Sequence, residues 1–168
     1  MRNWLKSLLF LSAFSPALLA LAGVRYYSVG LDTVFYQLTV VSVIGMTLPF
    51  FILNLVRKQA EKINFKAKKV ESADYLLIVF LASYIAPIIM KVAEINFEIT
   101  TLILGVLLVA VWFISYIPTH PLLYIAKFRF YKVESDSGMV YVLMAKRVIR
   151  SPQSIKEVKQ ISNSMLME

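Results

Sequence analysis

The chain has no cysteine and little charge. Of its 168 residues, 17% are Asp, Glu, Lys or Arg, one is His and five are Gly, whereas about 25% of an ordinary soluble domain is charged. Without cysteine, disulfides, thiolate metal sites and cysteine nucleophiles are excluded. The sequence also holds no His pair, no Gly-rich phosphate loop and no local Ser–His–Asp signature. We therefore predict no catalytic residue, no metal site and no cofactor, and we expect that the chain is not an enzyme.

Long stretches of the chain carry no charge at all. Asp, Glu, Lys and Arg are absent from four runs: Ser7–Val24, Thr33–Val56, Tyr75–Met90 and Ile99–Ala126. An ionised side chain at the bilayer centre costs at least ~2.5–3.5 kcal/mol, so membrane helices exclude it. Crossing a ~30 Å hydrocarbon core takes about 20 helical residues. The runs predict four transmembrane helices, at about 4–24, 33–56, 73–91 and 99–118. The third run is the shortest, and its span requires Asp74 and Lys91 at the two interfaces.

The predicted fold class is an all-α membrane protein of four transmembrane helices with a small cytoplasmic C-terminal β-hairpin plus helix. Residues 1–121 form the transmembrane domain, 57–71 a basic loop within it, and 122–168 the tail. All Lys and Arg except Arg25 and Lys91 fall on the side of the termini and this loop, so the positive-inside rule places both termini in the cytoplasm.

The N-terminus has a second interpretation. Arg2 and Lys6, an apolar stretch and then Ala20-Leu21-Ala22-Gly23 resemble a signal peptide with a small-residue cleavage site. Cleavage leaves three spans in the same orientation.

The loop at 57–71 combines basic residues with an apolar stripe. The stripe has helical spacing and consists of Val56, Ala60, Ile63, Ala67 and Val70. It predicts that the second helix continues into the cytoplasm or turns along the membrane surface. The charge alone is explained by a topology signal on a solvated face, whereas the stripe favours a docking surface for another protein or for the tail.

The tail alternates aromatic and basic residues and then turns. Residues 128–133, the turn Ser135–Gly138 and the β-rich stretch 139–149 predict a β-hairpin, with a bulge between Phe130 and Tyr131 where the alternation shifts. Ser151 and Pro152 then open a predicted helix, with an apolar stripe of Ile155, Val158, Ile161 and Met165. Such a unit is too small to be stable alone, so we expect it to pack on the second helix, a copy of itself or a partner.

Nine basic residues are candidate contacts to a protein partner or to anionic lipid: Arg57, Lys58, Lys62, Lys66, Lys69, Lys127, Arg129, Lys146 and Arg147. The aromatic and basic stretch 128–132 is compatible with nucleic-acid contact, but strand patterning beside a membrane explains it equally well. We expect no direct nucleic-acid binding.

The order of spans, basic loop, hairpin and final helix resembles the membrane subunit of the Kiwa anti-phage defence system. The resemblance is carried by Phe130–Val133, Gly138–Ala145, Lys146–Ser151 and Ile161–Glu168. It implies an oligomeric component of the bacterial inner membrane that detects phage attack and works with a cytoplasmic, nucleic-acid-binding partner. It transfers no site residue to this chain.

Two classes of function follow. The first is a non-enzymatic sensor or scaffold, homo-oligomeric and in contact with membrane lipids, which recruits a cytoplasmic effector. The alternative is a small pore-forming channel or transport component. Spans without Asp, Glu or His argue against proton coupling and suit a hydrophobic gate.

Overall fold

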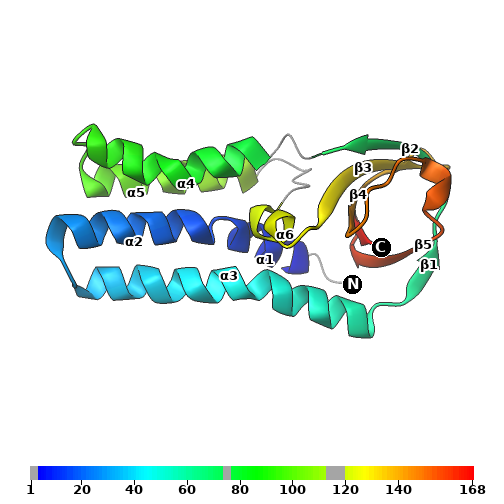
Figure 1. Cartoon of the computed structure of the whole chain (residues 1–168), viewed down its shortest axis with the longest axis horizontal. Coiled ribbons are helices and arrows are strands. Elements are labelled where there is room, and N and C mark those ends of the chain that lie inside the picture. Colours follow the sequence, from blue (N-terminus) through cyan, green and yellow to red (C-terminus); the bar gives the residue numbers. More distant parts are fainter. Residues whose placement is uncertain (1–3, 74–76, 113–119) are drawn as a thin grey trace.

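The computed structural model describes residues 4–73, 77–112 and 120–168. The helices are α1 (Trp4–Ala13), α2 (Ser15–Val29), α3 (Thr33–Gln59), α4 (Leu77–Val92), α5 (Phe97–Trp112) and α6 (Pro121–Ile125), with a 3₁₀ turn at Pro152–Ser154. The strands are β1 (Lys62–Asn64), β2 (Ala67–Ser72), β3 (Arg129–Ser135), β4 (Val140–Ala145), β5 (Glu157–Ser162) and β6 (Met165–Met167). Helices fill one end of the elongated molecule and the sheet fills the other (Figure 1).

The predicted fold class is wrong, because the chain contains a six-stranded sheet of order β1-β5-β6-β4-β3-β2. Only two helices among the described residues are long and apolar enough to cross a membrane, Ser7–Val29 and Thr33–Gln59. The described lengths of α4 and α5 are 16 residues each, short of the roughly 20 that a span requires. The predicted third and fourth spans reach residues 74–76 and 113–119, which lie outside the described residues.

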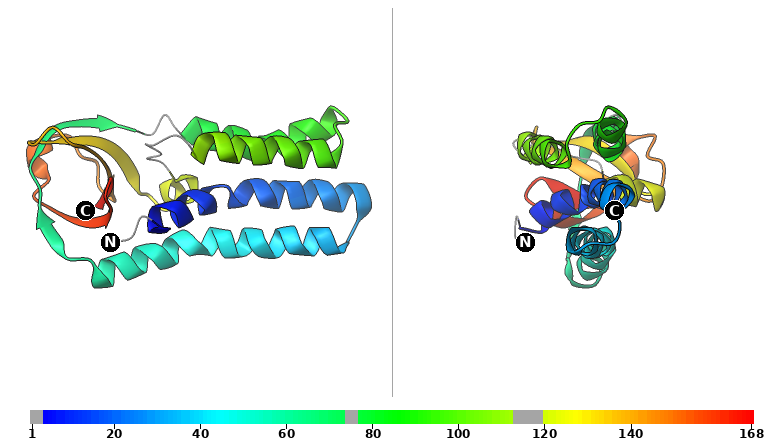
Figure 2. Two further views of the ribbon diagram at one scale, coloured as in Figure 1. Left: turned by 180° about the vertical axis from the view of Figure 1, so that it is seen from behind. Right: turned by 90° about the vertical axis from the view of Figure 1, so that its left-hand side faces the viewer.

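The segment after α3 is extended and not helical. The helix ends at Gln59, and Ala60 has strand-like backbone angles. The apolar stripe misled the prediction because it omitted Phe65. Ile63, Phe65 and Ala67 alternate with period two, which is the spacing of a strand. β1 pairs with β5 and β2 pairs with β3, so this basic segment supplies both edges of the sheet. The two edges lie on opposite sides of the curled sheet (Figure 2).

The predicted β-hairpin is confirmed. β3 and β4 pair antiparallel without a shift in register, and Gly138 in the turn has φ of 78°. The predicted bulge is therefore wrong. The alternation shifts because the sheet is buried on both faces: Phe130 packs in the core beside the helices and Tyr131 packs in a second core on the opposite face.

The predicted final helix is also wrong. A single 3₁₀ turn is followed by β5 and β6. Val158 and Ile161 lie three residues apart, which suits one face of a helix. On β5 they point instead to opposite faces, each of which has its own core. Burial on both faces thus produced an apolar spacing that imitates a helix.

One core joins the two ends of the molecule. It combines Leu9 of α1, Val56 of α3 and Leu123 of α6 with Phe130 and Ile161 of the sheet, and all five are buried. The sheet is consequently attached to the end of an apolar helix by packing as well as by chain connection.

Candidate functional site

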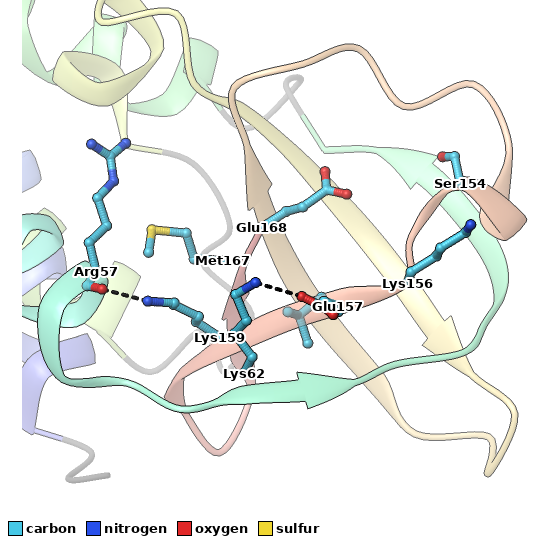
Figure 3. A pocket seen from close by; sticks show the side chains of 9 residues that line it. Arg57, Lys62, Ser154, Lys156, Glu157, Lys159, Met167 and Glu168 are labelled. Carbon is cyan, nitrogen blue, oxygen red and sulfur yellow. Dashed lines mark hydrogen bonds and ion pairs between the residues drawn. The ribbon is translucent and has the colours of Figure 1, made fainter.

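An open pocket of ≈ 460 Å³ lies where α3 passes into the sheet. Its lining comes from the end of α3, from β1, from β5 with the turn before it, and from the last two residues of the chain (Figure 3). The polar side chains that line it are Arg57, Lys62, Ser154, Lys156, Glu157, Lys159 and Glu168. The pocket is therefore built from two stretches that are distant in the sequence, 57–62 and 154–168.

Both carboxylates of the pocket are neutralised by ion pairs. Lys62 Nζ lies 2.8 Å from Glu157 Oε2, and this hydrogen bond lowers the pKa of Glu157 and raises that of Lys62. Arg147 Nε donates to Glu168 Oε2 at 3.0 Å, and its Nη2 lies 2.5 Å from Oε1. The Glu168 hydrogen bond likewise raises the pKa of Arg147.

Two lysines of the pocket remain without a carboxylate partner in the part of the chain that the structure describes. Lys159 Nζ donates to the backbone carbonyl of Arg57 (Figure 3), which carries no formal charge. Lys156 lines the same pocket from the residue beside Glu157. The pocket thus keeps a net positive charge and is suited to bind an acidic group.

Strand pairing brings these residues together. Lys62 lies directly opposite Lys159 in the β1–β5 register, and Asn64 lies opposite Glu157. The pairing sets two like charges side by side, and the Glu157 carboxylate compensates the Lys62 charge. Lys156 and Lys159 are absent from the candidates proposed from the sequence, because a helix was expected there. Reading residues 157–162 with period two places Glu157 and Lys159 on one face of a strand, which is the signal that finds Lys159.

A second group of cations gathers on aromatic rings beside the pocket. Arg57 Cζ lies 5.6 Å and Lys146 Nζ 5.1 Å from the ring centroid of Phe128. Arg129 lies over Tyr124 at 5.0 Å and donates to its hydroxyl at 2.7 Å. These distances are typical of cation–π contacts.

The remaining sequence candidates are dispersed. Lys58 is exposed near the end of α3 and Lys127 is exposed with φ of 65°. Lys66 lines a neighbouring pocket of ≈ 480 Å³ that shares Lys156 with the main pocket, and Lys69 pairs with Glu71 on β2. Of the nine predicted contacts, Arg57 and Lys62 line the main pocket, and Arg147 pairs with its Glu168. Lys146 lies over the Phe128 ring together with Arg57.

A buried polar seam runs beside the site and was not predicted. His120 precedes α6 and is 4% exposed, with Nε2 2.9 Å from Ser12 Oγ. Because the single Ser12 hydroxyl hydrogen is donated to the Leu9 carbonyl, His120 Nε2–H must be the donor to Ser12 Oγ. Nδ1 is then an acceptor without a partner among the described residues. Burial lowers the pKa of His120 to about 3, so the ring is neutral.

The seam continues through the break between α1 and α2. Ser15 Oγ donates to the Ser12 carbonyl, Ser42 Oγ on α3 donates to the Ser15 carbonyl at 2.7 Å, and Tyr84 OH on α4 donates to the Ala13 carbonyl. Hydroxyl groups of neighbouring turns and helices therefore satisfy the carbonyls freed where the helix is interrupted.

The described residues contain no group of three or more His, Cys, Asp or Glu placed to hold a metal ion. The molecule is a bundle of apolar helices that carries a basic sheet at one end. The apolar helices indicate membrane association. A family model described as anti-phage protein KwaA matches residues 5–167. The chain belongs to the KwaA anti-phage protein family and so has a role in anti-phage defence, which confirms the resemblance to the Kiwa membrane subunit. Searches of curated proteins and of solved structures find no match.

Proposed function

We propose that the chain is a non-enzymatic sensor and scaffold of the bacterial inner membrane that holds a cytoplasmic effector protein at the membrane during phage attack. The observation that carries the proposal is the pocket with uncompensated Lys156 and Lys159, which is built directly on the end of an apolar helix of 27 residues. A partner bound in this pocket stays within a few residues of the membrane.

The orientation follows from the basic residues. In the proposed arrangement Ser7–Val29 and Thr33–Gln59 cross the membrane as a helical hairpin, and the sheet lies in the cytoplasm. The sheet segments carry most of the Lys and Arg. At the opposite end of the hairpin, the only basic residue near the loop between α2 and α3 within these two helices is Arg25. This distribution supports the proposal through the positive-inside rule.

The partner is proposed to present an acidic surface. A protein pocket that retains positive charge attracts a carboxylate-rich segment over about one Debye length, ~8–10 Å at physiological ionic strength. The predicted interaction weakens with salt, because Lys156 and Lys159 are solvent-accessible.

Charge reversal in the pocket tests the recruitment. Lys156→Glu with Lys159→Glu should abolish retention of the cytoplasmic effector on membranes and lower phage resistance at least about tenfold, since like charges across an interface cost several kcal/mol. Lys68→Glu with Lys132→Glu makes the same change of net charge on β2 and β3, whose residues do not line the pocket, and should retain both activities. Copurification and phage plating measure the two effects. Full retention by the pocket variant would contradict the proposal.

The sensor part of the proposal is supported by the seam through His120. The break in the first apolar helix is tied by Ser42 to α3 and by Tyr84 to α4, while Ser12 is tied to the residue before α6. α6 leads directly into β3. In the proposal, a displacement of α1 or α2 within the membrane is transmitted to the sheet through this short series of side-chain contacts.

We further propose that the chain assembles with copies of itself. Ala13 and Ala17 are buried within the subunit, so that pair of small residues is already used in internal packing. Ala82 on α4 is exposed and Ala86 is partly exposed, which leaves a small-xxx-small face for close contact with a second copy.

A further inference from the structure

Two cations share one aromatic ring where α3 meets the sheet. Arg57 and Lys146 both approach Phe128, at 5.6 and 5.1 Å from its centroid. Phe128 is held in the core and is 4% exposed, whereas both cations are exposed. Arg57 comes from α3 and Lys146 from the segment after β4. The fold assembles this pair, since the two residues are far apart in the sequence.

Neither cation is neutralised by a carboxylate within residues 4–73, 77–112 and 120–168. The ion pairs among these residues are Arg25–Asp32, Lys62–Glu157, Lys69–Glu71 and Arg147–Glu168. The ring attracts each cation, but two positive charges held on one ring repel each other. An anion in contact with both removes that repulsion, so the pair is suited to bind a phosphate.

The position of the pair indicates which phosphate binds. Arg57 lies in the last turn of the apolar helix Thr33–Gln59, and the end of a membrane span lies at the level of the lipid headgroups. Ile125 of α6 is 78% exposed and is followed two residues later by exposed Lys127. An exposed apolar side chain beside cations is typical of segments that lie in the membrane interface.

We infer that Arg57 and Lys146, supported by Phe128, bind the phosphate of an anionic phospholipid in the cytoplasmic leaflet, with Ile125 inserted among its acyl chains. The inference rests on the proposed membrane anchoring. The bound lipid connects α3 to the segment after β4 and so holds the sheet at a set distance from the bilayer. Lys156 and Lys159 remain available to the protein partner.

Thermal unfolding of the full chain in neutral detergent tests the site. Phosphatidylglycerol should raise the Tm of the wild type, because a ligand that binds only the folded state stabilises it. Arg57→Gln with Lys146→Gln should reduce that rise by about threefold or more. Lys66→Gln with Lys68→Gln removes the same charge elsewhere and should keep the rise. Phosphatidylcholine and inorganic phosphate should give little change.

Each alternative result has a definite meaning. An equal rise in Tm for the Arg57 and Lys146 double variant overturns the site, and an equal rise with inorganic phosphate overturns a lipid as the occupant. If the double variant does not fold, Lys146→Gln is compared with Lys146→Arg, which keeps the charge. Lys156→Glu with Lys159→Glu should lose the protein partner and keep the lipid response. A lipid response lost only in that variant places the lipid in the pocket and overturns the inference, while the recruitment result stands separately.

Discussion

The two ends of the α2–α3 hairpin differ in whether the protein neutralises its own charged side chains. At the loop end, Arg25 Nε and Nη2 donate to Asp32 Oδ2 at 2.9 and 2.6 Å. Asp32 Oδ1 accepts the Phe35 N–H at 2.8 Å and caps α3, and the Arg25 guanidinium lies over Phe97 at 5.1 Å. Arg25 and Asp32 therefore neutralise each other within the fold, and neither charge is left for a ligand.

At the sheet end the cations exceed the carboxylates. Glu157 and Glu168 are each paired, yet Lys156 and Lys159 line the same pocket without an acidic partner in the described part of the chain. Charge that the protein does not neutralise is available to a ligand. The comparison supports the proposal that a partner binds at the sheet end, because the Arg25–Asp32 charges are used within the fold.

The sharpest way to break this comparison is to weaken the core beneath the sheet. Phe130 is 0% exposed in the core shared by helices and sheet, so Phe130→Ala should lower the free energy of unfolding by ~3–5 kcal/mol. Phe51 on α3 is 62% exposed, and Phe51→Ala should change stability by less than about 0.5 kcal/mol in detergent. Chemical denaturation measures both. Similar losses for the two variants would show that the sheet does not depend on this core.

The second largest effect is expected in the buried polar seam around His120 and Ser12. Ser12→Ala removes the acceptor of His120 Nε2–H and leaves both nitrogens of the buried ring unsatisfied, at a cost of ~1–3 kcal/mol. If the seam carries the signal, phage resistance should fall further than this loss of stability explains. Ser28→Ala removes a comparable hydroxyl contact to the Val24 carbonyl at an exposed position and serves as the control. Matched resistance in the two variants would exclude the seam from sensing.

The sequence predicted the parts of the fold that depend on local pattern. The apolar runs indicated the helices Ser7–Val29 and Thr33–Gln59, and the turn with Gly138 indicated the β3–β4 hairpin. β1, β2, β5 and β6 were missed because their local spacing also fits a helix, as with Val158 and Ile161, and because their pairing is nonlocal. Their backbone partners lie far away in the chain, as with Lys62 and Lys159, and no local spacing reports such a pairing.

The site was predicted only in part for the same reason. Arg57 and Lys62 were candidates because they stand in a dense basic segment next to an apolar run. Lys159 was not chosen, since its approach to Arg57 depends on the pairing of β1 with β5. The neutralisation of Glu157 also depends on this pairing, so the surplus charge of the pocket could not be counted from composition. The length of an apolar run is a local property, whereas the free charge of a pocket is a property of the folded chain.

The smallest expected effect concerns the loop end. The hydrogen bond from Arg25 lowers the pKa of Asp32 below its ordinary value of 3.8. A carboxylate whose pKa is lower in the folded state stabilises the protein above its unfolded pKa, and this contribution is lost as pH falls through the folded value. Asp32→Asn keeps a side-chain oxygen for the Phe35 N–H but has no charge, so it should lower Tm slightly at neutral pH. Because both proteins contain His120, the difference between their Tm values isolates Asp32, and it should shrink below the ordinary pKa of Asp32. A difference that does not change with pH would mean that the Arg25 contact contributes through hydrogen bonding alone, and the loop end would then owe its stability to the cap of α3 and not to its charge.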